Sequence, residues 1–458
     1  MNINEATPNS TAGIVWPALP DRHAAALLAL QYQLEQTEWW SPEALREAQM
    51  NQVAVVLRHA FDTIPFYRER LSAAGYQPQE PLTEQVFAHV PFLQRSEIQA
   101  QGKALLSLKV HPAHGRVTTG VTSGSMGHPI QYFSTELTQY FWQAFTLREH
   151  IWHGRDIMGR IAAIRTGLND GVVPTWGPPT SLVFSTAPCA TLDIRTDVSA
   201  QLDWLRNQEV DYLLSYPTNV RALAEASIAG NVVLAHLREV RTLGEMVDQD
   251  LRDLCRKAWG VKLVDIYSAR EVGYLALQCP HQEHYHVQSE NLLVEVLDEN
   301  NTPCKVGEIG RVVVSTLNNF AMPLIRYEIL DHAEVGAPCP CGRGLPVLNR
   351  VLGRQRNMVT FPDGRRHWPS TGYKEWSVRL PILQGQIVQR SLTTIEAKLV
   401  PSRPLTAAEE SEFTAILHRS LGYPFKIIFS YHQEIPRSAG GKFEDFYSEV
   451  NPPPSAEQ

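Results

Sequence analysis

A short segment between residues 118 and 129 carries the strongest chemical signal in the sequence. It contains five hydroxyl side chains and three glycines in twelve residues. Glycine leaves backbone N–H groups accessible and the hydroxyls add further donors, so such a segment can surround an anion. The pattern lacks the lysine that ends the loop of the P-loop enzymes. It predicts a phosphate-binding loop of another type, with an ordinary polar turn as the alternative.

Charged residues follow apolar or glycine-rich runs at four later places. Asp265 and Glu271 come after the apolar run at 261–264, and Asp331 follows the segment 323–327. Arg354 comes directly after Gly353, and Lys442 follows a pair of glycines on an expected loop tip. Open α/β sheets bind ligands at the carboxyl ends of their strands, so we expect Asp265 at such an end. Taken singly, each residue could equally be a solvated or salt-bridged surface charge.

Cysteine and histidine residues form a second constellation. Cys279 is followed by His281, His284 and His286, and Cys339 and Cys341 come about sixty residues later, just before a glycine. Two thiolates beside a glycine suit a tight knuckle on tetrahedral zinc, and a distant cysteine with one histidine would complete four ligands. The pattern predicts a structural zinc site, and reduced, partly buried thiols are the alternative.

The elements that must position these residues change character along the chain. Residues 1–20 and 452–458 are expected to be frayed tails, and a helix is expected from Ser41 to Phe61 with Ser41 as its N-cap. From about residue 108, short apolar runs alternate with helical stretches, which indicates βαβ-type layers. The expected strands are 161–164, 182–185, 212–214 and 261–267, and the expected helices are 198–207 and 217–228.

The pattern changes again after residue 291. Apolar residues then recur with a period of two over 292–296 and 310–314, which predicts an antiparallel hairpin or a small barrel. Beyond residue 353 the chain restarts with a short β pattern near 361–364. Strands near 395–400 and 426–430 and a helix over 406–420 predict a small α+β domain.

Composition limits the class of protein. The chain has 458 residues, a net charge of −7 and 43% hydrophobic residues, which indicates two or three globular domains. No basic run stands out, so nucleic acid and anionic membranes are not expected partners. No apolar run reaches the ~18 residues of a membrane span, no secretory signal is visible, and six cysteines are too sparse for a disulfide scaffold. We therefore expect a cytoplasmic multidomain enzyme.

In this order and spacing the motifs resemble the adenylate-forming superfamily, and within it the phenylacetate–CoA ligase family and its capsule-biosynthesis relatives. The resemblance runs from about residue 40 to 446. It implies an α/β fold with a large multi-layer N-terminal domain, residues 1–353, that has βαβ-type sheets and a small β-barrel. A small α+β lid domain, residues 354–458, would follow and would rotate about a hinge at 354–356.

The resemblance also implies roles for individual residues. Lys442 would contact the reacting carboxylate and the α-phosphate, and Glu271 would bind Mg²⁺. Tyr267 would lie against the adenine ring, Asp331 would bind the ribose and Arg354 would lie near the hinge and phosphates. The rest of the ATP site would be formed by a phosphate loop (Thr122, Ser123, Gly124, Ser125, Gly127) and an adenine pocket (Gly244, Glu245).

Some members of the family carry zinc on a Cys, a His before an apolar residue, and a Cys-x-Cys-Gly-Arg segment. His286 fits that pattern best, so the implied ligands are Cys279, His286, Cys339 and Cys341, with His281 as the alternative to His286. The sequence departs from the family at Met126 and His128 in the phosphate loop and at 328–330 before Asp331. The usual glycine-containing thiol-tunnel segment is also replaced, by 362–366.

The implied reaction is ATP-dependent activation of an aryl or acyl carboxylic acid to an acyl adenylate. The acyl group would then pass to a thiol, either coenzyme A or the pantetheine arm of a carrier protein. Two alternatives are amide formation with an amine and a non-catalytic nucleotide-binding scaffold. A homodimer would be typical of the family. An aromatic stripe on an expected helix (Tyr140, Phe141, Trp142, Phe145) could form the floor of an acid pocket or simply be core.

Overall fold

The computed structural model describes residues 1–122, 129–354, 357–369, 371–438 and 441–450. It divides into two compact units, Met1–Val351 and Leu352–Gln458, close to the boundary expected after residue 353. None of the helices in the described residues combines the length and the hydropathy that crossing a membrane requires. Each unit is described by itself below.

Unit 1 is built on one mixed sheet of twelve strands in the order β11-β12-β13-β14-β10-β9-β8-β7-β6-β3-β5-β4. Strands β5, β3, β6, β7 and β8 pair in parallel, while β8 pairs antiparallel with β9. Strand β8 is therefore the seam between a parallel half and an antiparallel half. In chain order the parallel half and its edge strand are β3 (Ile161–Arg165), β4 (Gly171–Val173), β5 (Cys189–Asp193), β6 (Tyr212–Ser215), β7 (Glu239–Leu243) and β8 (Lys262–Ala269).

The antiparallel half confirms the expected hairpin, because residues 292–297 pair antiparallel with residues 311–316. Within the described residues these strands form one end of the large sheet and do not close into the separate small barrel that we expected. Strands β11, β12 and β13 follow one another in the chain, whereas Tyr285 of β10 pairs with Leu348 of β14, a contact that the period-two pattern does not reveal. The strands are β9 (Gly273–Gln278), β10 (Tyr285–Val287), β11 (Leu292–Leu297), β12 (Ile309–Thr316), β13 (Tyr327–Val335) and β14 (Val347–Arg354).

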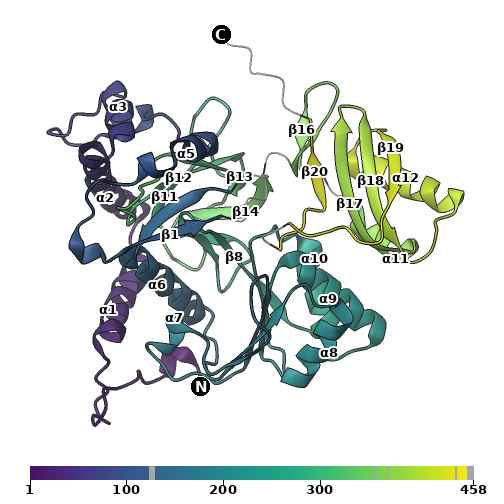
Figure 1. Ribbon diagram of the computed structural model, residues 1–458, viewed down its shortest axis with the longest axis horizontal. Coiled ribbons are helices and arrows are strands. Elements are labelled where there is room, and N and C mark those ends of the chain that lie inside the picture. The colour runs from purple at the N-terminus through teal and green to yellow at the C-terminus, as the bar shows by residue number, and fades with distance from the viewer. Residues whose placement is uncertain (123–128, 355–356, 370, 439–440, 451–458) are drawn as a thin grey trace. The chain divides into compact units, whose positions relative to one another are not determined.

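Helices cover both halves. In the parallel half, α8 (Val198–Gln208), α9 (Pro217–Gly230) and α10 (Gln249–Trp259) lie side by side and share one apolar core with strands β3, β6, β7 and β8 (Figure 1). The expected helices at 198–207 and 217–228 are confirmed. A second core lies under the antiparallel half and includes residues of α2 and α3. The remaining helices of unit 1 are α1 (Arg22–Thr37), α2 (Pro42–Thr63), α3 (Pro65–Ala73), α4 (Glu84–His89), α5 (Arg95–Gln101), α6 (Glu136–Trp152) and α7 (Pro178–Ser181).

Helix α6 follows a two-stranded sheet of β1 (Val117–Val121) and β2 (Gln131–Thr135). Thr135 caps the helix, with its hydroxyl accepting from the backbone N–H of Thr138. The segment that joins β1 to β2 is the candidate phosphate loop. Sequence order alone therefore ties the base of that loop to the start of α6.

Three local expectations are wrong. Residues 182–185 are not a strand; they follow α7, and Val183 and Phe184 are buried in the core around α1 and α6. The N-terminal residues are not frayed, because Ile3 is 2% exposed and its N–H donates to the Arg155 carbonyl at 3.0 Å. Asp265 lies within β8 rather than at its end, and its carboxylate accepts from Thr242 and Tyr285.

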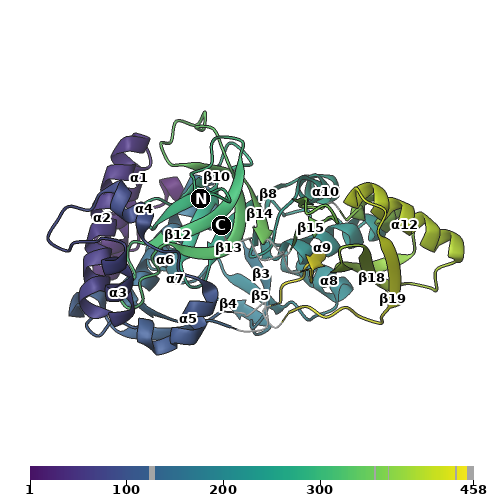
Figure 2. The ribbon, with the colours of Figure 1, turned by 90° about the horizontal axis from the view of Figure 1, so that it is seen from above.

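Unit 2 contains a four-stranded sheet in the order β19-β18-β17-β20. Helix α12 (Ala407–Leu421), capped by Thr406, lies beside β18 and β19 (Figure 2) and packs Phe413 and Ile416 into the core of the unit. The expected strands and helix of this unit are confirmed. The remaining elements are β15 (Val359–Thr360), β16 (Arg366–His367), α11 (Tyr373–Arg379), β17 (Ile382–Ser391), β18 (Thr394–Pro401), β19 (Lys426–Tyr431) and β20 (Phe446–Ser448).

Candidate active site

Glu271 lies in the tight turn between β8 and β9 and is 9% exposed. Its Oε1 is 4.0 Å from a guanidinium nitrogen of Arg95 and 3.5 Å from the Tyr327 hydroxyl, which donates to it. Burial and the negative charge of Glu271 raise the pKa of Tyr327, so its phenol keeps its proton and remains a donor. The turn therefore holds a nearly buried carboxylate with a cation beside it.

Arg95 joins Glu271 to the candidate phosphate loop. It is the first residue of α5, and its NH2 donates to the Thr122 hydroxyl at 3.2 Å. The same hydroxyl accepts from the Ile130 N–H at 2.9 Å, and the Thr122 N–H donates to the Ile130 carbonyl. The base of the loop is thus paired on itself and attached to Arg95. The other expected loop residues, namely Ser123, Gly124, Ser125 and Gly127, lie outside the described residues.

Tyr267 and Asp331 meet across the sheet. Tyr267 is in β8 and Asp331 is in β13, and the tyrosine hydroxyl donates to Asp331 Oδ2 at 2.9 Å. The expectation placed these two residues on the adenine ring and on the ribose of one nucleotide. The structure brings them together from segments 64 residues apart.

Gly244 and Glu245 follow the end of β7 in the parallel half. Gly244 has a φ of 80°, a backbone conformation that favours glycine. Glu245 Oε2 accepts from the Thr218 N–H at 2.9 Å, in the first turn of α9. A carboxylate at a helix N-terminus is stabilised by the helix dipole, which fixes this turn against α9.

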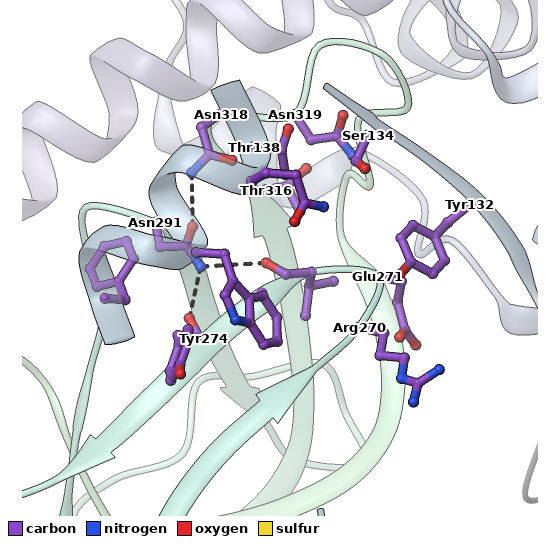
Figure 3. Close-up of a pocket in the computed structure, with 15 residues that line it drawn as sticks. Tyr132, Ser134, Thr138, Arg270, Glu271, Tyr274, Asn291, Thr316, Asn318 and Asn319 are labelled. Carbon is purple, nitrogen blue, oxygen red and sulfur yellow. Dashed lines mark hydrogen bonds between the residues drawn. The ribbon is translucent and has the colours of Figure 1, made fainter. Parts of the chain in front are cut away.

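A pocket opens beside Glu271 (Figure 3). Figure 3 shows Arg270 and Tyr132 beside Glu271, while Asn291, Asn318 and Tyr274 gather on the other side. Asn318 donates to Asn291 Oδ1 at 2.8 Å, and Asn291 donates to the Tyr274 carbonyl at 2.8 Å.

Helix α6 supplies part of the pocket wall through Thr138, Gln139, Trp142 and Phe145. The expected aromatic stripe is therefore divided: Trp142 and Phe145 line the pocket, while Tyr140 and Phe141 are partly buried and pack against the neighbouring core.

Lys442 and Arg354 belong to unit 2. The backbone of Lys442 is held in a tight turn, in which its N–H donates to Ser438 Oγ at 3.2 Å and its carbonyl accepts from the Ser438 N–H at 2.9 Å. The guanidinium of Arg437 donates to the Gly441 carbonyl at 3.2 Å. The Arg354 N–H donates to Asn357 Oδ1 at 3.2 Å.

Cysteine and histidine side chains gather at a separate place in unit 1. Ligand atoms of Cys279, His284, His286 and Cys339 all lie within 4.8 Å of one another. Cys341 Sγ is 3.4 Å from His286 Nε2. His281, which the sequence analysis gives as the alternative to His286, is exposed and is not part of this group.

Two distances, one within this group and one from His286 to Cys341, suit tetrahedral zinc. Zinc bonds of about 2.3 Å to sulfur and about 2.0 Å to nitrogen would hold two sulfur ligands about 3.8 Å apart and a sulfur–nitrogen pair about 3.6 Å apart. The Cys279 and Cys339 sulfurs are 3.8 Å apart, and the Cys341–His286 pair is close to its ideal separation. The 2.9 Å between His284 Nε2 and Cys339 Sγ is shorter than either and fits a hydrogen bond.

Protonation suits a metal at His286 and Cys341, whereas burial raises the pKa of the Cys279 and Cys339 thiols, which a metal would have to deprotonate. Burial lowers the pKa of His286 to about 3, so its imidazole is neutral. Burial raises the pKa of the Cys339 thiol to about 12, whereas hydrogen bonds from the Arg343 backbone N–H and guanidinium outweigh burial and lower the pKa of Cys341. All six cysteines of the chain are free of disulfides.

Sequence reasoning gave no role to Arg95 or Tyr327, and it named His284 in the cysteine–histidine constellation without choosing it as a ligand. Arg95 and Tyr327 carry no motif, because they reach Glu271 only after the antiparallel half has folded. His284 lies directly before β10, two residues from His286, and its carbonyl accepts from the Cys279 N–H at 2.9 Å.

We compared the sequence and the structure of the chain with those of known proteins. No family model matches the chain. Phenylacetate-coenzyme A ligases from Thermus thermophilus and Escherichia coli are 24% and 23% identical, over 69% and 71% of this chain and 72% and 75% of theirs. A solved 2-hydroxyisobutyryl-CoA ligase, in complex with 2-HIB-AMP, matches with a TM-score of 0.73 at 18% identity, over 91% of this chain and 92% of that one.

The chain has the fold of the adenylate-forming ligases. A solved anthranilate CoA ligase in complex with anthranoyl-AMP shares this fold with a TM-score of 0.54 and 15% identity, over 73% of this chain and 67% of that one. Within the adenylate-forming fold of this chain, Thr122, Tyr267, Glu271 and Asp331 all belong to unit 1. In sequence the chain is phenylacetate–CoA ligase-like, as the order of its motifs predicts.

Proposed function

We propose that the chain is an adenylate-forming acid–thiol ligase. A carboxylate oxygen of the substrate attacks the α-phosphorus of ATP, pyrophosphate leaves, and the product is an acyl adenylate. A thiol sulfur then attacks the acyl carbonyl carbon, AMP leaves with the bonding electrons, and a thioester forms. The observation that carries this proposal is the junction in which Arg95 joins Glu271 to Thr122, within a chain that has the adenylate-forming fold.

The first step must bring two anions together. A carboxylate and a polyphosphate repel each other, and the reacting atoms must come within about 3 Å. Cationic groups fixed in advance lower this barrier because they need no reorganisation as the reaction proceeds. In unit 1 the guanidinium of Arg95 is such a group, since it is buried beside Glu271 and bonded to the base of the loop. We propose Lys442 of unit 2 as the cation that contacts the reacting carboxylate and the α-phosphate.

The nucleotide would be held by residues on both sides of β8. We propose that the loop from Thr122 to Gly127 binds the β- and γ-phosphates, that Gly244 and Glu245 line the adenine pocket with Tyr267, and that Asp331 binds the ribose. Carboxylate oxygen is the ligand that Mg²⁺ prefers, so Glu271 would hold this ion, which supplies positive charge to the phosphates. Arg354 completes the proposed nucleotide set.

A structural zinc ion is part of the same proposal. Cys279, His286, Cys339 and Cys341 would hold it, and His284 would hydrogen-bond to Cys339. Four protein ligands fill a tetrahedral zinc, so this ion would supply rigidity rather than chemistry.

The acid and the acceptor are proposed more broadly. The relatives named above include ligases for phenylacetate, 2-hydroxyisobutyrate and anthranilate, so we propose a small aryl or acyl acid, with Trp142 and Phe145 of the pocket as candidate contacts. Coenzyme A is the proposed acceptor, and a carrier-protein pantetheine arm is the second candidate. A cytoplasmic location and a homodimer belong to the proposal on the basis of the resemblance alone.

Acid-dependent release of pyrophosphate tests the function. Purified protein would be given MgATP and a panel of aryl, hydroxy and fatty acids, and then coenzyme A, a pantetheine carrier or simple amines. We expect one acid class to release pyrophosphate and coenzyme A to convert the adenylate to a thioester. Amide products without thioester would instead support the amide-forming alternative. No turnover with any acid, together with no ATP binding, would favour a scaffold.

A further inference from the structure

Arg343 lies two residues beyond the cysteine pair, and only 9% of its side-chain surface is exposed. Its Nε donates to Glu38 Oε1 at 2.9 Å, and its NH1 donates to Cys341 Sγ at 3.7 Å. Its guanidinium lies over the rings of Trp39 and Trp152, 4.8 and 4.5 Å from their centroids. One side chain thus contacts a proposed metal ligand, a buried carboxylate and two indoles.

Glu38 connects Arg343 to helix α6. Its Oε2 accepts from Trp152 Nε1 at 2.8 Å and lies 3.3 Å from the Arg148 guanidinium, and both partners are on α6. Arg148 in turn makes a bidentate contact with Glu290, at 2.9 and 3.0 Å. The last turn of α6 is therefore held from two sides by buried charge, and an edge-to-face contact of Trp152 with His286, 5.8 Å between ring centroids, adds a direct link to the cluster.

The other end of α6 reaches the active-site pocket. Thr138 and Gln139 of its first turn and Trp142 line it, and the cap residue Thr135 ends β2, the strand that follows the candidate phosphate loop. A helix is stiff along its axis, so anchoring its last turn restricts the position of its first turns.

We propose that Arg343 is a positioning residue through which the cysteine–histidine metal site holds helix α6, and with it the pocket wall beside Glu271. Metal binding fixes the loop of Cys339 and Cys341; Arg343 is carried by that loop and fixes Glu38 and Trp152. This inference rests on the proposed zinc site. It assigns that site an effect on the active centre that four filled coordination positions do not by themselves provide.

Hydrogen exchange of α6 in a two-by-two comparison tests the link. Wild type and Arg343→Lys would each be measured with metal bound and after removal by a chelator, with metal content determined in every sample. Lysine keeps the positive charge but lacks the planar guanidinium that donates two hydrogen bonds and stacks on the indole rings. Arg343→Ala, which also removes the charge, is a second variant. Arg350→Lys is the matched control, because Arg350 forms an exposed ion pair with Glu334 on the neighbouring strand β13.

We expect wild type to lose protection in α6 when the metal is removed, and tryptophan emission to shift in parallel. In Arg343→Lys, α6 should exchange faster even with full metal content, and metal removal should change it little further. The apparent metal affinity of this variant should fall about 10- to 100-fold, as is usual when a partner of a ligand is lost. Arg350→Lys should behave as wild type does.

Three results would overturn the inference. Equal loss of α6 protection on metal removal in wild type and Arg343→Lys would show that Arg343 does not carry the link, and unchanged α6 exchange in metal-free wild type would show that no link exists. Absence of bound metal in wild type would contradict the metal site and the inference together, while leaving the acid-dependent release of pyrophosphate unaffected. The three results are therefore distinguishable.

Discussion

Arg95 is a single residue that the sequence did not identify, and its positive charge is part of the proposed chemistry. It contributes a largely buried guanidinium beside the proposed phosphate loop, whose sequence has histidine at position 128. Because its guanidinium contacts both Thr122 and Glu271, a single side chain joins the loop base to the proposed Mg²⁺ ligand.

Replacing Arg95 with methionine should therefore weaken use of ATP. The variant loses the charge-assisted hydrogen bond to Thr122, which is worth about 1.5–3 kcal/mol, so kcat/KM for ATP should fall about 10- to 100-fold. Arg95→Lys should recover part of this loss because the charge returns. Steady-state kinetics with ATP as the varied substrate measures the effect. Arg46→Met, which removes a surface ion pair with Glu84, is the control, and an Arg95→Met enzyme with wild-type kinetics would contradict the assigned role.

At the scale of elements, local signals predicted much of the structure. Ser41 and Pro42 predict the start of α2, and Thr406 with Glu409 predicts the start of α12, because caps act within one turn. The strand predicted at 182–185 is wrong because an apolar run indicates burial and not strand formation. Val183 is fully buried, but it lies in a turn. The antiparallel half was predicted only in part, since the period-two pattern identifies the β11–β12 hairpin but not the pairing of β10 with β14.

The candidate site was predictable to a similar degree. Residues inside motifs, such as Glu271 and Asp331, could be named because type and order identify them. Arg95 and Tyr327 could not, because only the folded sheet brings them to Glu271. For the metal cluster, sequence named the cysteines, while the choice among three histidines depended on strand geometry around β10.

Close packing of the cysteine knuckle against the end of α1 makes a second test possible. A Cβ on Gly344 would lie 1.7 Å from the Trp40 carbonyl oxygen, and the Gly344 N–H donates to the Glu38 carbonyl at 2.9 Å. Backbone must therefore move to accommodate any side chain there. Gly344→Ala should lower the free energy of unfolding of unit 1 by about 1–3 kcal/mol, as overpacking typically does.

Denaturant unfolding monitored by tryptophan emission would measure the effect of Gly344→Ala. The control is Gly230→Ala at the end of α9, where a Cβ would meet only Val232 Cγ2 at 3.4 Å and the stability should change by less than about 0.5 kcal/mol. Equal denaturant midpoints of unfolding for the two variants would show that the backbone at Gly344 can shift without loss of stability.

At the scale of the whole molecule, the proposed reaction draws on both units, since Glu271 belongs to unit 1 and Lys442 to unit 2. The two chemical steps differ in what they ask of a cation. Adenylation brings together two anions, whereas thioester formation joins a thiol to a carbonyl that carries no charge. A cation should therefore matter more for the first step.

Lys442→Ala should reduce acid-dependent pyrophosphate release about 10²–10³-fold, the usual cost of losing one preorganised donor. Thioester formation from a supplied acyl adenylate should fall much less. Lys426→Ala, an exposed lysine at the start of β19 in the same unit, serves as the control. Full adenylation activity in Lys442→Ala would refute the assigned role, and equal losses in both steps would point to damage to the unit rather than to charge.

Strand β8 separates two regions with different interiors: the apolar cluster beneath the parallel half and the one beneath the antiparallel half share no residue. The proposed contacts of one nucleotide come from each region, with Gly244 and Glu245 on one flank and Asp331 on the other. A bound nucleotide would then contact both regions and help to hold them together, in addition to the apolar cluster of α1 and α6 that packs on both sides of β8. Nucleotide binding would then stabilise the contact between the two regions, and the site of the reaction would also contribute to the stability of unit 1.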